Sequence, residues 1–215
     1  LTSYFAQMFG TRNFAAHGGF CTVNMAAAGL HTVGGAFWEF GEPDWEYAKL
    51  FLLIGVAEDH DSNPIKLGLG RLKERGAKII AINPVRTGYG AIADEFVAIT
   101  PGTDGLFIFA LIHCLLESGS IDAEFLIRHS NAHYLVIDAP GSAQHGLIAR
   151  DAQGQALAWD RLRGAPAIAE AADTSPALLG TYTLPDGLTV QPAFALAAER
   201  YLAPDYAPEE VAGRC

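Results

Sequence analysis

Three short apolar runs, separated by stretches with helix signals, constrain the fold of this chain most. The runs read "KLFLLIG" (49–55), "AKIIAINP" (77–84) and "DEFVAITP" (94–101). Runs of this length that end in Gly or Pro are typical of buried strands in a parallel sheet. Between the first two runs, Asn63 as a cap, Pro64 at the first helical position and Gly76 at the end predict a helix. Strands that alternate with helices predict an α/β fold with a mostly parallel, Rossmann-like sheet flanked by helices.

A second helix is predicted over "TDGLFIFALIHCLLESG", which begins at Thr103 or Asp104 and ends before Gly119. This segment is apolar nearly all round, so we expect it to be buried on all sides. His113 and Cys114 are then interpreted as core residues.

The last third of the chain has a different character, rich in Ala, Gly and Pro. Turns at Gln153–Gly154 and Asp186–Gly187 predict hairpins, and Pro192 and Pro208 each stand where a helix begins. We therefore predict a core that holds two sub-domains with a boundary near 40–48, a small irregular or β-hairpin insertion, and a helical segment. Their ranges are 1–135 for the core, 136–191 for the insertion and 192–215 for the helical segment.

The charge balance excludes some partners. The chain has 14 Lys and Arg against 24 Asp and Glu, a net charge of −10, and no cluster of basic residues. Nucleic acid is therefore not an expected partner. The longest apolar run, Leu106 to Leu116, is too short to span a bilayer, so direct membrane insertion is not expected either. The compartment stays open between cytoplasm and periplasm, with the cytoplasm favoured.

The predicted sheet also indicates where a ligand binds. In open α/β sheets, ligands bind beyond the carboxyl ends of the strands. Those ends are loops rich in Gly, Pro, Asp, Asn and Thr, at 55–61, 83–88 and 100–105. No G-x-G-x-x-G follows a strand and no Walker A motif is present, so an ordinary nucleotide-binding domain is disfavoured.

The stretch "HGGFCTVN", His17 to Asn24, contains one of only three cysteines, Cys21. Free Cys usually packs as a small hydrophobe, which is one interpretation of this residue. The rest of the sequence has to decide whether this thiol has a further role. His17 and Asn24 flank the thiol and serve either as proton donor or substrate contact, or only in local hydrogen bonds.

Several motifs resemble the molybdopterin-dependent oxidoreductases of the dimethyl-sulfoxide-reductase type, relatives of nitrate reductases and formate dehydrogenases. "GTRN" (10–13), with Cys21 eight residues after Asn13, is similar to the family's G-[ST]-x-N and its cysteine metal ligand. "INPVRTGYGAIADEFVAITPGTDG" (82–105) resembles the family's [DN]-P-x-[RK]-T and P-G-T-D block. The resemblance covers residues 8–135 well, and it implies that this chain is a fragment of a longer enzyme.

The resemblance implies a bis(molybdopterin guanine dinucleotide) cofactor with Mo or W, and an iron–sulfur cluster in an N-terminal part of the enzyme. Cys21 is then the metal ligand and a catalytic residue, and His17 is the second catalytic candidate. The expected cofactor-binding residues are Asn13, Gly18, Gly19, Gly55, Asn83, Pro84, Arg86, Thr87, Thr103 and Asp104. Thr22, which follows Cys21, matches neither the His of formate dehydrogenases nor the Met of periplasmic nitrate reductases.

Three of these expected cofactor-binding residues also have a competing interpretation. Arg86 and Thr87 are suited to donate to phosphate, but Arg86 is also interpreted as a solvated surface charge. Thr103 and Asp104 stand at a helix N-terminus, which attracts anions, and simple helix capping is the competing interpretation.

The function predicted from the resemblance is two-electron oxidation or reduction of a small-molecule substrate, with a redox partner subunit or electron carrier. The alternative is a structural or electron-transfer scaffold subunit that has the same fold and no cofactor. A cysteine that follows two glycines favours the enzyme, because a scaffold has no need for it.

Overall fold

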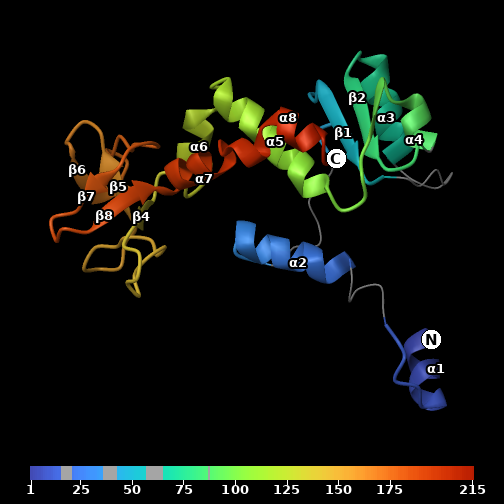
Figure 1. Ribbon diagram of the computed structural model, residues 1–215, viewed down its shortest axis with the longest axis horizontal. Helices are drawn as coiled ribbons and strands as arrows, with labels where there is room; N and C mark the ends of the chain where they lie inside the picture. Colours follow the sequence, from blue (N-terminus) through green and yellow to red (C-terminus); the bar gives the residue numbers. More distant parts are fainter. Residues whose placement is uncertain (16–20, 36–42, 57–64, 87) are drawn as a thin grey trace. The chain divides into compact units, whose positions relative to one another are not determined.

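The computed structural model describes residues 1–15, 21–35, 43–56, 65–86 and 88–215 (Figure 1). By its internal contacts the chain divides into two compact units, residues 1–51 with 60–79, and residues 52–59 with 80–215. Each unit is considered by itself.

Short helices and strands alternate along the described residues. The helices are α1 (Thr2–Phe9), α2 (Cys21–Thr32), α3 (Ile65–Glu74), α4 (Gly88–Ile92), α5 (Asp104–Glu117), α6 (Ala123–His129), α7 (Ala193–Tyr201), the 3-10 turn η2 (Pro204–Tyr206) and α8 (Pro208–Ala212). The strands are β1 (Leu50–Ile54), β2 (Lys78–Asn83), β3 (Glu95–Ala98), β4 (Leu135–Ile137), β5 (Leu157–Asp160), β6 (Ala165–Ile168), β7 (Tyr182–Thr183) and β8 (Thr189–Pro192). The fold is mixed α/β, as expected from the sequence.

The three apolar runs form one sheet of strand order β1-β2-β3. β2 pairs parallel with β3, with Asn83 opposite Ala98 in the register. Leu53, Ile79 and Ile82 are almost fully buried in these strands, which explains their continuous apolar sequence. The three predicted strands are therefore confirmed, while the finer Rossmann-like assignment stays a prediction.

In the first unit, Trp45 connects the segment before β1 to helix α3. A Cβ atom added at Gly68 would meet the Trp45 ring at 2.5 to 2.6 Å, so only glycine fits there. Trp45 also stacks on Phe51, with ring centroids 5.3 Å apart. Arg75 donates from its two terminal nitrogens to the carbonyls of Trp45 and Ala48, at 2.6 and 2.7 Å. These contacts hold the end of α3 against the segment that leads into β1.

In the second unit, two small antiparallel sheets follow α6, with strand orders β4-β8-β7 and β5-β6. The core of the first is formed by Leu135, Ile137, Leu184 and Val190 together with Ala149. The β7–β8 hairpin turns at Asp186–Gly187, where Leu184 N–H donates to Leu188 O at 2.9 Å. This turn was predicted from the sequence and is confirmed.

Helix α5 packs against α7 and α8, which are drawn beside it in Figure 1. His113 is buried and its Nδ1 lies 2.8 Å from the carbonyl oxygen of Tyr201. Cys114 is exposed, and Leu115 has 52% of its surface exposed. The expectations that α5 is buried all round and that Cys114 is a core residue are therefore wrong. α7 and α8 therefore cover α5 only in part among the described residues.

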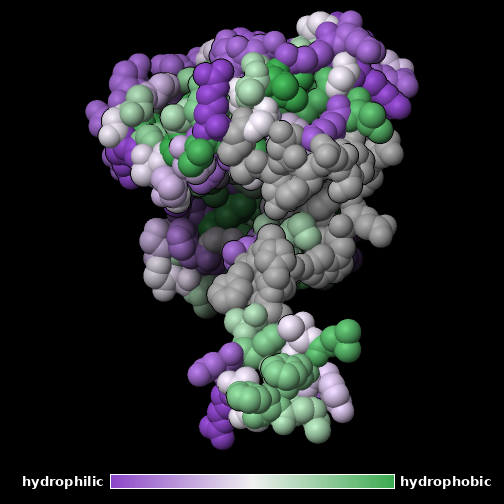
Figure 2. Space-filling view, turned by 90° about the vertical axis from the view of Figure 1, so that its right-hand side faces the viewer, coloured by the Kyte–Doolittle hydropathy of each residue, from purple (hydrophilic) through white to green (hydrophobic). Residues whose placement is uncertain are grey.

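Helix α1 exposes several large apolar side chains, Tyr4, Phe5, Met8 and Phe9 among them. This helix is drawn at the lower end of the space-filling view, where most of the surface is hydrophobic (Figure 2). None of the helices in the described residues is long and apolar enough to cross a membrane.

Candidate functional site at the carboxyl ends of the parallel strands

The carboxyl ends of β1, β2 and β3 lie next to one another, as expected for a ligand site in a parallel sheet. Gly55 N–H, just after β1, donates to Ile82 O at 3.0 Å. Ile99 N–H, just after β3, donates to Asn83 O at 3.3 Å. The second unit therefore brings together Gly55, Asn83 and the segment that leads to Thr103.

Asn83 is the last residue of β2, and only 3% of its surface is exposed. Its Nδ2 donates to Val56 O at 2.9 Å. A buried amide that donates to this carbonyl orients the segment just after β1. The expected cofactor contact of Asn83 remains a prediction, but the structure gives its side chain a positioning role that the sequence did not indicate.

Arg86 lies beyond Asn83 on the exposed surface, and its side chain is oriented by its neighbours. Its Nε donates to Gly90 O at 3.3 Å, and its guanidinium carbon lies 5.7 Å from the centre of the Phe96 ring. A Cβ atom at Gly90 would meet Phe96 at 3.0 Å and the Arg86 Cγ at 3.1 Å, so glycine makes room for both. These contacts orient the exposed Arg86 side chain, and both interpretations of this residue stay predictions. Pro84 is exposed, and Thr87 lies outside the described residues.

Thr103 occupies the N-cap position of α5 but does not cap it with its side chain. Its hydroxyl donates to Thr100 O at 2.7 Å instead, and Asp104 begins the helix at an exposed position. The simple capping interpretation is therefore wrong for the Thr103 side chain. The amide groups of the first turn keep the orientation that favours an anion.

The surroundings of this edge fit a large phosphorylated cofactor. Gly55 and Gly102 have φ angles of +70° and +88°, and a Cβ atom added at either would meet nothing within 4 Å. Open space beside glycines permits close approach of a bulky group to the backbone. Tyr89, in the helix after the β2 loop, has a buried hydroxyl with no hydrogen-bond partner among the described residues. Buried polar atoms are normally paired, so this hydroxyl is a candidate for a bound polar group.

The first unit carries the other predicted site residues. Cys21 is the first residue of α2, and Gly10 ends α1 with a φ angle of +78°. Asn13 is exposed, and its N–H donates to Thr11 Oγ1 at 3.1 Å. His17, Gly18 and Gly19 lie outside the described residues. The roles of all these residues stay predictions.

Among the residues that the structure describes, no group of three or more His, Cys, Asp or Glu could hold a metal ion.

Sequence comparison with known proteins identifies relatives of this chain. The chain is 49% identical to a sulfite dehydrogenase subunit of Allochromatium vinosum, over 97% of this chain and 22% of that protein. It is 31% identical to a putative dimethyl sulfoxide reductase catalytic subunit of Halobacterium salinarum, over 65% of this chain and 17% of that protein. It is 27% identical to the thiosulfate reductase molybdopterin-containing subunit of Salmonella typhimurium, over 60% of this chain and 16% of that protein. The chain is homologous to part of the molybdopterin oxidoreductases.

The resemblance drawn from the sequence motifs is thereby confirmed at the level of the family. No protein-family model matches the chain. The chain spans 16% to 22% of the length of the three relatives named above. The activity of the whole protein is for that reason a matter of proposal.

Two features of the segments that flank β2 carried no signal in the sequence. Tyr89 belongs to a five-residue helix with two glycines, which carries no periodic signal. The hydrogen bond from Asn83 to Val56 joins residues 27 positions apart, so no local sequence pattern predicts it.

Proposed function

We propose that this chain is part of the catalytic subunit of an enzyme that oxidises sulfite to sulfate. The supporting observation is the 49% identity to a sulfite dehydrogenase subunit over 97% of the chain, since the other relatives named above match less of it and less closely. The reaction consumes one sulfite and one water and yields sulfate, two protons and two electrons.

The proposed cofactor is molybdenum or tungsten on two molybdopterin guanine dinucleotides. When bound, it supplies two-electron chemistry coupled to transfer of an oxygen atom. Cys21 is the proposed metal ligand, because thiolates are soft ligands that suit such metals. Gly18 and Gly19 would let the backbone approach the cofactor, and His17 would accept or donate a proton at the substrate.

The guanine dinucleotide end is assigned to the carboxyl edge of the parallel sheet. Gly55 would admit the cofactor beside the backbone, and Arg86 and Thr87 would donate to its phosphates. Thr103 and Asp104, at the first turn of α5, would meet a further phosphate or a polar nucleotide group. Asn83 and Pro84 complete the proposed set at this edge, and Asn13 is proposed as a cofactor contact of the first unit.

The two electrons must leave the catalytic subunit for an acceptor. The relative in Allochromatium vinosum is named as one subunit of its sulfite dehydrogenase, which supports a redox partner subunit or electron carrier here. An iron–sulfur cluster elsewhere in the same polypeptide is proposed as the first acceptor.

The experiment uses the full-length protein, purified with any partner subunits from a host that makes molybdopterin. Molybdenum, tungsten and phosphorus are measured on one sample, and sulfite-dependent reduction of an artificial electron acceptor is measured on another. One metal and about four phosphorus atoms per chain, with turnover on sulfite, support the proposal. Metal and phosphorus without turnover on sulfite would refute the substrate. A folded protein with neither would favour the cofactor-free scaffold.

A further inference from the structure

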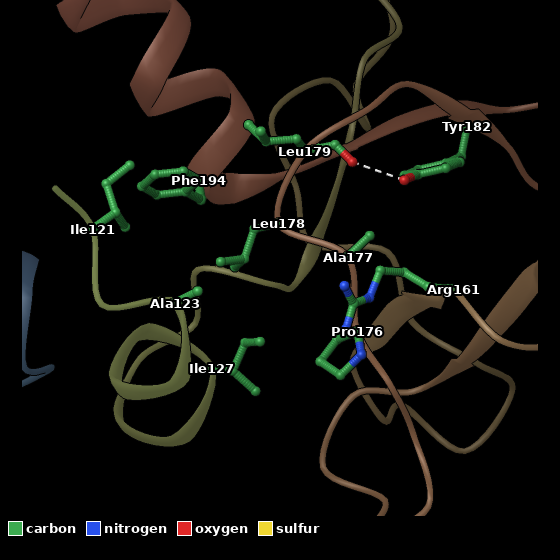
Figure 3. Close-up of a pocket in the computed structure, with 10 residues that line it drawn as sticks. All are labelled: Ile121, Ala123, Ile127, Arg161, Pro176, Ala177, Leu178, Leu179, Tyr182 and Phe194. Atoms are coloured by element: carbon green, nitrogen blue, oxygen red, sulfur yellow. Dashed lines mark hydrogen bonds between the residues drawn. The ribbon is translucent and has the colours of Figure 1, made fainter. Parts of the chain in front are cut away.

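A pocket of about 400 Å³ lies in the second unit, away from the carboxyl edge of the parallel sheet. Figure 3 shows Ile121, Ala123 and Ile127 on one side and the stretch Pro176–Leu179 facing them. The other lining residues are Phe194, Tyr182 and Arg161. Arg161 is the one charged side chain of this lining, and its guanidinium lies beside Pro176 and Ala177 (Figure 3).

The stretch Pro176–Leu179, which forms the wall of the pocket opposite α6, is fixed by contacts within the protein. Ala177 N–H donates to Trp159 O at 2.9 Å, which ties the stretch to β5. The Tyr182 hydroxyl donates to Leu179 O at 2.7 Å, and its ring stacks on Trp159 with centroids 4.3 Å apart. Gly180 has a φ angle of +108°, and a Cβ atom there would meet the Tyr182 hydroxyl at 2.7 Å, so the turn under this ring requires glycine. Such preorganisation lowers the cost of binding.

The Arg161 guanidinium has no carboxylate partner among the described residues. Arg161 is exposed, and two carboxylates of the same hairpin region are engaged by Arg163 instead, Asp160 at 3.0 Å and Asp173 at 2.5 Å. Arg161 itself donates only to a neutral group, from Nη2 to Ser175 Oγ at 3.1 Å. The guanidinium therefore retains N–H groups for an anion, in a pocket that is otherwise apolar.

We infer that this pocket binds a small amphipathic carboxylate, with an alkyl body among the apolar side chains and its carboxylate on Arg161. Small-molecule sites are pockets of about 300 to 1,000 Å³, mostly apolar, with a few placed polar groups. The planar guanidinium matches the two oxygens of a carboxylate. A charge on the part of the ligand that contacts the apolar side chains is disfavoured, because it would have no partner there. This inference is independent of the proposed redox function.

The test is photo-crosslinking of the full-length protein with decanoate that carries a diazirine at its alkyl end. The matched probe is decanol with the same diazirine, at the same concentration below micelle formation. Peptide mapping should place the decanoate adducts within residues 121–127 and 176–194, with about tenfold less labelling by the alcohol. Unlabelled decanoate should compete.

Variants separate the charge from the shape of the pocket. Arg161→Met should lower decanoate labelling about tenfold and leave decanol labelling unchanged. Arg200→Met is the matched control, since Arg200 is exposed and outside the pocket. Ile127→Trp should block both probes by filling the space, and circular dichroism checks that each variant folds.

Two results would overturn the inference. Equal labelling by the acid and the alcohol would remove the role of Arg161. Absence of adducts in the full-length protein would mean that another part of the polypeptide, a partner protein or a second copy fills the pocket.

Discussion

Gly68 and Gly70 lie two residues apart in α3 and have opposite surroundings. Gly68 faces the Trp45 ring, whereas a Cβ atom at the exposed Gly70 would meet nothing within 4 Å. Gly68→Ala should therefore lower the free energy of unfolding by about 1 to 3 kcal/mol through overpacking. Gly70→Ala should raise it by about 0.5 to 1 kcal/mol, because alanine reduces the entropy lost on forming the helix. Thermal unfolding of both variants checks this, and equal shifts would contradict the Trp45 contact.

Asn83→Ala removes the buried side-chain amide that donates a hydrogen bond to Val56 O. The expected cost is about 1 kcal/mol, since the carbonyl at this half-buried position then relies on water. Hydrogen exchange at Gly55, whose N–H donates to Ile82 O, should become faster in this variant. Unchanged exchange at Gly55 would mean that the amide does not hold the segment after β1.

Single residues were predictable from the sequence where a local rule applies. A glycine inside a predicted helix indicates close packing, and the Trp45 ring against Gly68 fits this rule. Gly70, with open space around it, does not fit the rule. That Arg161 has no carboxylate partner among the described residues could not be predicted, because the folded structure decides which arginine contacts Asp160 and Asp173.

The β5–β6 hairpin depends on the ionised side chain of Asp160. Burial raises the pKa of Asp160, but hydrogen bonds from the backbone of Arg163, Leu162 and Ser175 and the charge of Arg163 outweigh burial and hold this pKa below its ordinary value. A lowered pKa in the folded state means that the stabilisation is complete above the unfolded pKa, near 3.8, and is lost as the pH falls from there through the folded pKa.

Asp160→Asn should therefore lower the unfolding temperature at pH 7 and have a smaller effect as the pH falls below about 4. Asp205→Asn, which changes an exposed carboxylate outside the hairpin, is the control. The measurement is thermal unfolding of the three proteins across this pH range. A difference between the wild type and Asp160→Asn that stays constant with pH would show that the charge has no part in the stabilisation.

Elements with a start signal, a stop signal or an uninterrupted apolar run were predictable. α7 and α8 begin beside Pro192 and Pro208 as expected, and β1 to β3 match the three apolar runs. β4 was missed, because three residues are too few for a periodic pattern and its partner β8 lies more than 50 positions away. The burial of α5 was misjudged, since the composition of a helix does not reveal which neighbours cover it.

At the scale of the whole molecule, α1 is a distinct apolar surface. Its large side chains, Tyr4, Phe5, Met8 and Phe9, are 65% to 74% exposed. Apolar patches of this kind promote association, so the 215-residue chain on its own should bind the dye ANS and self-associate. Phe5→Glu with Phe9→Glu should lower both signals, whereas Tyr47→Glu, at an isolated exposed position, should not. Equal dye binding by the wild type, the double variant and Tyr47→Glu would mean that a surface other than α1 binds the dye.

Two of the proposed roles fall on different units of the chain, and variants of the full-length protein should separate these roles. Cys21, in the first unit, is assigned to the metal, and Arg86, in the second, to a cofactor phosphate. Arg86→Met should lower the phosphorus and metal content together, about tenfold at limiting cofactor, because one charge-assisted contact is lost.

Cys21→Ser should instead keep the phosphorus content and lose most of the turnover on sulfite, because a serine hydroxyl is a harder ligand than a thiolate. Elemental analysis and activity on the same preparations give both readouts, with Arg200→Met as control. Full turnover in Cys21→Ser would mean that Cys21 is a packed thiol and not the metal ligand. Loss of phosphorus in Cys21→Ser but not in Arg86→Met would instead mean that cofactor retention depends on the first unit, and the assignment of the nucleotide to the sheet edge would fail.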